Sequence, residues 1–166
     1  EALLAGYRAV LCSPRFLTFI EKPGPLNDHA LASRLSYALW VSMPDGKLSR
    51  AAGEGTLRNP ETLDAAIDRM LADAKFERFI NSYSDQWLKL NEIGFTNPDP
   101  RQFRTFDPVV QQSMLKETRA FLREMIQSDL GAAAIVDSDF AFLNDRLARH
   151  YQVNAKFEPG RGLQKV

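Results

Sequence analysis

Two acidic side chains, Glu117 and Asp85, offer the most direct route to catalysis in this sequence. Glu117 is flanked by basic residues, and Asp85 stands close to Trp87. A glycoside hydrolase needs two such acids about 5 to 9.5 Å apart across a cleft, and spacing alone does not place this pair so. We therefore favour a simpler interpretation, in which Glu117 pairs with an arginine on a helix face. A hydrolase that acts on polysaccharide or another polymer is the alternative.

Arg34, Trp40 and Trp87 are candidates for binding. Arg34 lies among apolar residues, where it either presents its guanidinium to an anion or partner, or forms an internal ion pair with Glu117 or an aspartate. We favour the internal pair, because a buried arginine usually requires one. The two tryptophans would suit a sugar-binding platform, but aromatic residues at helical spacing usually belong to the core. We expect them there.

A third candidate is the stretch FLNDRLARHY, at residues 142–151. Asn144 is of the type that caps a helix. Arg146, His150 and Tyr151 would then line a small polar site. The simpler interpretation is a capped helix whose C-terminal dipole favours His150, and we prefer it.

The spacings that bind metals, haem or nucleotides are missing from the sequence. It has no CxxC, CxxCH or HExxH motif, no phosphate-binding glycine loop and no GxSxG elbow. His29 and His150 are the only histidines. The single cysteine, Cys12, excludes an internal disulfide, and we expect it to be a buried, inert thiol. We predict no metal or cofactor site in this chain.

Helical periodicity dominates, which predicts an all-α domain of about six to seven helices in an irregular bundle. The central helix begins at Asn27 or Asp28, stops before Pro44 and presents one apolar stripe, made of Leu31, Leu35, Leu39 and Ser42. Further helices are expected at residues 1–12, at 60–91 with a division at Asp73, and at 108–128. Shorter ones are expected to start at Pro14, to end near Gly53 or Gly55, and to start at Leu143 or Asn144. Strand-like alternation is confined to residues 134–142.

We expect three parts in the chain. Residues 1–21 are the end of a preceding helical module that packs on the main domain. The main domain is 22–153, and residues 154–166 are an arm or a truncated element. Residues 92–106 form a long loop. An exposed apolar patch around Phe95, Phe103 and Phe106 would mark that loop as a protein-binding surface.

Composition excludes some classes of function. The 166 residues suffice for one domain with a sizeable core. Lys plus Arg and Asp plus Glu balance at 21 each, which argues against nucleic-acid binding and a polybasic membrane patch. No apolar run approaches the roughly 20 residues of a membrane span. Because the sequence begins at Glu1 without Met, we expect a fragment of a longer protein whose localisation signal has been removed.

Several segments, in order, resemble a known family. They are LASRLSYALWVSMPDGKL, RMLAD followed by FINSYSDQWLKL, PDPRQFRTFD with LKETRAFL, and DFAFLNDRLARHYQV. Together they resemble a helical domain of unknown function found in large planctomycete-type proteins, often in one polypeptide with a c-type haem domain. The opening GYRAVLCSPRFLTFIE resembles the end of the module that precedes it. Gln152 replaces an expected glycine, and Arg104 an expected proline.

The resemblance implies a module of a multidomain, exported or periplasmic protein whose haem ligands lie outside this chain. It offers no catalytic residues to carry over. Its partners would be neighbouring domains of the same polypeptide, with no nucleic acid and no membrane insertion. We therefore expect a non-catalytic structural or interaction module, with the hydrolase as the alternative.

Overall fold

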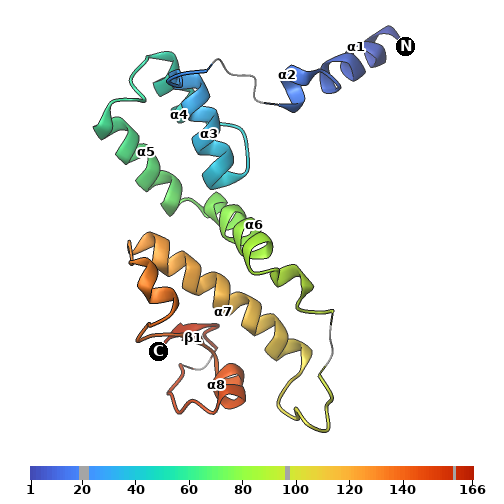
Figure 1. Cartoon of the computed structure of the whole chain (residues 1–166), viewed down its shortest axis with the longest axis vertical. Helices are drawn as coiled ribbons and strands as arrows, with labels where there is room; N and C mark the ends of the chain where they lie inside the picture. Colours follow the sequence, from blue (N-terminus) through green and yellow to red (C-terminus); the bar gives the residue numbers. More distant parts are fainter. Residues whose placement is uncertain (19–22, 96–97, 159) are drawn as a thin grey trace. The chain divides into compact units, whose positions relative to one another are not determined.

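The computed structural model describes residues 1–18, 23–95, 98–158 and 160–166. Over these residues it is mostly helical with one small two-stranded sheet, which confirms the all-α prediction (Figure 1). In chain order the elements are α1 (Ala2–Leu11), α2 (Pro14–Leu17), α3 (Asp28–Trp40), α4 (Gly46–Gly53), α5 (Pro60–Ala72), η1 (Ala74–Phe76), α6 (Glu77–Trp87), η2 (Leu90–Glu92), α7 (Pro108–Gln127), η3 (Ala132–Ile135), β1 (Phe142–Leu143), α8 (Asp145–Tyr151) and β2 (Gln164–Lys165).

The chain forms two compact units. The first comprises Glu1–Tyr37 and Ser42–Ala66, and the second comprises Ala38–Val41 and Ile67–Val166. Every residue of α1 is exposed. Cys12, which follows α1, is exposed as well, so the prediction of a buried thiol is wrong. The predicted boundary at residues 21–22 lies outside the described residues. The packing of residues 1–21 on the main domain stays a prediction.

The first unit is tied together at the start of α3. Asn27 caps the helix, since its Oδ1 accepts a hydrogen bond from the Ala30 N–H at 2.8 Å. Asp28 instead faces inward, accepting from the Leu57 N–H at 3.0 Å and from Arg58 Nε at 2.6 Å. Burial raises the pKa of Asp28, but these contacts outweigh it and hold that pKa below its ordinary value.

The buried stripe of α3 is Asp28, Ala32, Ser36 and Trp40. The predicted stripe of leucines lies one position away and is only partly buried. Small residues at 32 and 36 permit close approach, while the larger leucines pack at the flanks. The helix ends at Trp40 rather than continuing to Met43, because the next residue, Val41, has a left-handed φ of 51°. Arg34 is exposed, so the prediction that it lies in the core is wrong, whereas its ion pair with an acidic residue stays a prediction.

A cap divides the predicted helix at 60–91, as expected. Asp73 Oδ1 accepts a hydrogen bond from the Lys75 N–H at 2.8 Å, which starts η1 and then α6. The same arrangement confirms the interpretation of Trp40 as a core residue. Its ring is 0% exposed, Nε1 donates to the Met70 carbonyl at 3.0 Å, and the Lys75 ammonium lies 4.4 Å from the ring centroid.

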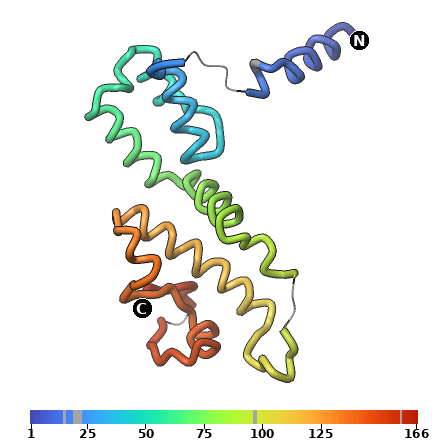
Figure 2. The backbone as a smooth tube through the Cα atoms, in the orientation of Figure 1, coloured from blue at the N-terminus to red at the C-terminus, as the bar shows by residue number. Residues whose placement is uncertain are grey.

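The second unit contains two hydrophobic clusters. Helices α6 and α7 pack side by side (Figure 2), around Phe76, Ile80 and Leu122. The other cluster joins α7, β1 and α8 through a set of buried residues, Val110, Leu143, Leu147 and Ala148. Strand β2 pairs antiparallel with β1, so residues 164–165 of the predicted arm complete the sheet.

Two exposed aromatic residues of this unit lie in the long loop, of which residues 96–97 are outside the described part. Phe95 is 91% exposed and Phe103 is also exposed, whereas Phe106 packs against the second cluster. The predicted patch of three phenylalanines is therefore wrong for Phe106. No helix in the described ranges combines the length and apolar character that crossing a membrane requires.

Candidate functional site

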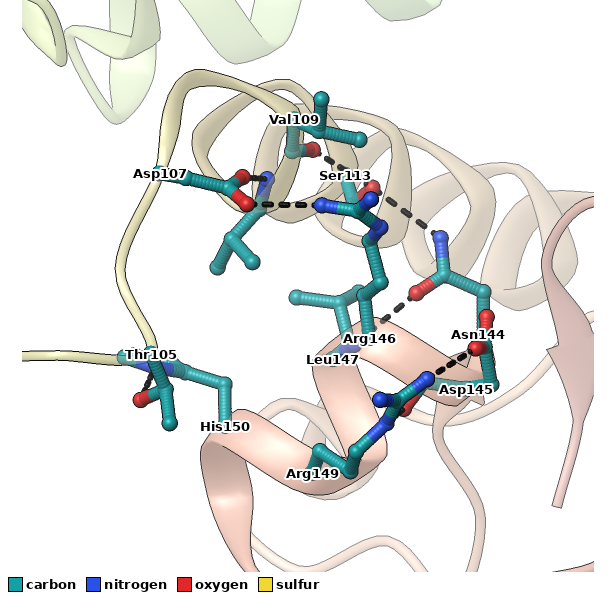
Figure 3. Close-up of polar contacts among 11 residues, drawn as sticks. Thr105, Asp107, Val109, Ser113, Asn144, Asp145, Arg146, Leu147, Arg149 and His150 are labelled. Atoms are coloured by element: carbon teal, nitrogen blue, oxygen red, sulfur yellow. Dashed lines mark hydrogen bonds and ion pairs between the residues drawn. The ribbon is translucent and has the colours of Figure 1, made fainter.

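The start of α7 fixes the first wall of a polar site (Figure 3). Asp107 caps the helix, with Oδ1 accepting from the Val110 N–H at 2.7 Å, and Pro108 takes the first helical position. The second oxygen, Oδ2, accepts from Arg146 Nη1 at 2.7 Å. The bond from Val110 does most to lower the pKa of Asp107, burial opposes it, and Arg146 lowers it further. Asp107 is therefore ionised at neutral pH.

Asn144 positions α8 against α7. Its Oδ1 accepts from the Leu147 N–H at 2.9 Å, which confirms the predicted cap. Its Nδ2 donates to Ser113 Oγ at 3.0 Å, and that hydroxyl donates to the Val109 carbonyl at 2.8 Å. Leu147 is fully buried beneath the turn. One amide side chain thus caps α8 and links it to α7.

His150 closes the site from the far end of α8. Thr105 Oγ1 and His150 Nδ1 share a hydrogen bond of 2.8 Å, whose donor depends on the ring tautomer (Figure 3). The His150 ring also lies 6.0 Å from that of Phe106. These contacts hold the loop before α7 against α8.

The result is a pocket of about 270 Å³ whose lining carries three guanidinium groups and one carboxylate. Its lining residues are Arg104, Thr105, Asp107, Val110, Arg146 and Arg149. Arg149 Nη2 is bonded to Asp145 Oδ2 at 2.5 Å, on its own helix. Arg104 makes no ion pair within the described ranges. Because each guanidinium carries five N–H donors, the pocket retains donors for an anion.

The two predicted acids do not share a pocket among those of the described residues. Glu117 lines a separate pocket of about 410 Å³ and accepts from the Tyr151 hydroxyl at 2.8 Å. Its predicted pairing with an arginine is therefore wrong. Arg119 binds Asp85 instead, at 2.8 Å. Residues two apart on a helix face different directions, so Arg119 contacts α6 while Glu117 contacts α8.

The remaining candidates are not among the residues that line this pocket. Arg34 belongs to the first unit. Trp40 is buried, so it offers no ring to a sugar. Trp87 is 47% exposed and ends a row of rings along α6, 5.5 Å from Tyr83, so the prediction that it lies in the core is wrong. Over the described ranges, no group of three or more His, Cys, Asp or Glu side chains has the arrangement to hold a metal ion.

Of the six residues that line this pocket, sequence reasoning singled out only Arg146, and it missed Arg104, Thr105, Asp107, Val110 and Arg149. A signal for Arg149 was present, because it stands three residues after Arg146 and so shares its helix face. Arg104 attracted notice only as a substitute for proline. Its place in the pocket depends on the docking of the loop against α8, which no local pattern announces.

A family model described as PSD4, protein of unknown function (DUF1592), matches residues 26–153 of the chain. No curated protein and no solved structure matches the chain. The matched range contains α3 to α8. It also contains every residue that lines the pocket of Arg104, Arg146 and Arg149, called the arginine pocket from here on. The chain belongs to the PSD4 family of proteins of unknown function, DUF1592.

Proposed function

We propose that this DUF1592 domain is a non-catalytic interaction module that holds an acidic group of a neighbouring domain in the pocket of Arg104, Arg146 and Arg149. One observation carries the proposal: three guanidinium groups from a loop and a helix line one pocket with a single carboxylate. Arginine donates two parallel hydrogen bonds to a carboxylate, and such charge-assisted bonds are stronger than neutral ones.

The size of the pocket and the charge of the chain favour a carboxylate on a protein. A volume of about 270 Å³ suits one side-chain group, and the balance of 21 basic and 21 acidic residues offers no extended field for a polyanion. We place the partner in the same longer polypeptide, exported and carrying a c-type haem domain, as the family resemblance implies.

The acids of the second unit support a non-catalytic role. Asp107 already binds the Val110 N–H and Arg146, and its lowered pKa makes it a poor proton donor at neutral pH. Asp85 is bonded to Arg119. The hydrolase alternative needs Asp85 and Glu117 together across one cleft, and Asp85 does not line the Glu117 pocket.

Titration of the 166-residue chain with a tetraglutamate peptide, followed by amide NMR shifts, tests the proposal. We expect shifts at Thr105 and Arg149, and binding that weakens as salt rises. The variant Arg104→Gln/Arg149→Gln should weaken binding about tenfold. Arg146 is left in place because it also holds Asp107.

The matched control is Arg8→Gln/Arg50→Gln, which removes two exposed arginines from the first unit. It should bind the peptide as the unchanged chain does. Equal loss in both double variants would mean that only net charge matters, and would overturn the proposed pocket. A Soret band or stoichiometric metal in the purified chain would overturn the expectation that its cofactors lie elsewhere.

A further inference from the structure

A second pocket of the second unit, of about 410 Å³, lies between α7, α8 and the segment that leads into β1. Its walls combine polar surface with an apolar, aromatic part made of Phe121, Ile135, Phe140 and Phe142. Phe121 and Phe140 are stacked with ring centroids 5.3 Å apart, and Phe142 meets Phe140 edge-on at 6.0 Å. The rings brace one another, so the wall is built before any ligand arrives.

Glu117 is the charged group of this pocket. It is partly buried, and its Oε2 accepts from the Tyr151 hydroxyl at 2.8 Å. Within the described part of the chain no basic side chain pairs with it. Other acids of the chain do have basic partners, as in Asp28–Arg58, Asp85–Arg119, Asp107–Arg146 and Glu124–Lys165.

The lack of a counter-ion has a cost that a ligand can relieve. A partly buried carboxylate loses hydration, and a neutral phenol replaces only part of it. Burial raises the pKa of Glu117 and the Tyr151 bond only partly offsets this. The pKa of Tyr151 is also raised, by burial and then by Glu117, so the phenol keeps its proton and remains the donor.

One ring of this group, Phe140, already contacts an ammonium. Lys165 Nζ lies 4.1 Å from the Phe140 ring centroid while it binds Glu124 Oε1 at 2.5 Å. This pairing of an ammonium with a ring and a carboxylate is what the Glu117 pocket would offer a second cation. Lys165 itself does not line that pocket.

We propose that the Glu117 pocket binds an organic cation, a primary ammonium on an apolar stem. Glu117 is the counter-ion, and the rings of Phe121, Phe140 and Phe142 receive the stem and the cation's edge. An acidic ligand is repelled by Glu117. A sugar finds few free partners, because the Thr118 and Ser138 hydroxyls donate to the carbonyls of Met114 and Phe140.

This site is independent of the proposed arginine pocket, since it shares no lining residue with it. The two pockets also select opposite charges. Failure of one proposal therefore leaves the other standing, and the variants that test them differ.

The experiment compares benzylammonium with benzyl alcohol, titrated into the 166-residue chain at neutral pH and followed by calorimetry and by NMR of the aromatic rings. We expect the ammonium to bind about tenfold more tightly than the alcohol. Glu117→Gln should remove that preference. Glu92→Gln, which changes an exposed glutamate, should keep it.

Two further arms make the result decisive. Tyr151→Phe retains the carboxylate and removes its only hydrogen-bond donor in the described part of the chain, so this variant should still prefer the ammonium if the pocket folds. N-acetyl-lysine methylamide tests whether the cation can come from a protein side chain, and equal or tighter binding than benzylammonium would identify that source. Equal binding of benzyl alcohol and benzylammonium, or an unchanged preference in Glu117→Gln, would overturn the proposal.

Discussion

Asp107 and Glu117 belong to the same helix segment but have opposite surroundings. Asp107 meets the free N–H groups at the start of α7 and a guanidinium from α8. Glu117 stands in the middle of α7, where the backbone N–H groups are already used, and meets a phenol and several rings. The pKa of Asp107 is accordingly lowered and that of Glu117 is raised.

The difference shows that α8 provides opposite chemistry to the two pockets. Arg146 and Arg149 line the arginine pocket, whereas Tyr151 lines the Glu117 pocket. A carboxylate that has its own counter-ion organises structure and leaves surplus cations for a ligand. A carboxylate without a counter-ion is itself the recognition group.

The largest expected effect removes the support that both pockets share. Leu147 is fully buried and anchors α8 against α7 and β1. Leu147→Ala should lower the free energy of unfolding by about 2–5 kcal/mol, as measured by urea denaturation. Peptide binding and ammonium binding should both weaken. Loss of one without the other would contradict a common support.

A smaller effect on stability distinguishes Asp107 from Glu117 by its dependence on pH. Asp107→Asn keeps a side chain that can cap α7 but loses the ion pair with Arg146, so it should lower the thermal midpoint at pH 7. Because the pKa of Asp107 is lowered on folding, its stabilisation is present above the unfolded value of about 3.9 and is lost as pH falls through the folded value. The deficit should therefore shrink in acid.

The matched control for this variant is Asp145→Asn, which breaks the exposed pair with Arg149 on the same helix. Such pairs contribute about 0.3–0.5 kcal/mol, so its thermal midpoint should change little. A control that loses as much stability as Asp107→Asn would show that the bridge between α7 and α8 has no special weight.

Glu117→Gln should change the thermal midpoint at pH 7 in the opposite direction to Asp107→Asn, and by a smaller amount. The pKa of Glu117 is raised, so its contribution to stability is complete below the unfolded value and is lost as pH rises through the folded value. Glutamine stays neutral and still accepts from Tyr151. The variant should therefore be at least as stable as the unchanged chain at pH 7, with the advantage vanishing near pH 3. Thermal melts at several pH values would reveal the reverse order if the interpretation is wrong.

Local features of this fold could be predicted from the sequence because local contacts create them. Asp73, Asp107 and Asn144 each bind an N–H two or three residues ahead. A short polar side chain before a helical pattern predicts this bond directly. The α3 stripe was misplaced by one position because periodicity fixes a face only approximately, and leucines were assumed to be the deepest residues.

The partners of the charged residues could not be predicted in this way. Tyr151 reaches Glu117 across 34 positions, and Arg119 reaches Asp85 across 34 as well. Both contacts depend on how the helices pack, and neighbours in the sequence gave Glu117 the wrong partner. Of the residues considered on α8, Arg146 lines the arginine pocket and Tyr151 lines the other one, while Arg104 joins Arg146 through the loop.

The smallest expected effect on stability tests whether the arginine pocket is built for a ligand. Arg149 is bonded to Asp145 on the exposed side of α8, and Arg104 has no ion pair in the described part of the chain. The variant Arg104→Gln/Arg149→Gln should thus change the free energy of unfolding by less than about 0.5 kcal/mol, while tetraglutamate binding falls. Urea denaturation and peptide titration of one sample separate the two. A stability loss that matches that of Asp107→Asn would make these arginines structural, and the contrast between a structural carboxylate and surplus cations would then fail.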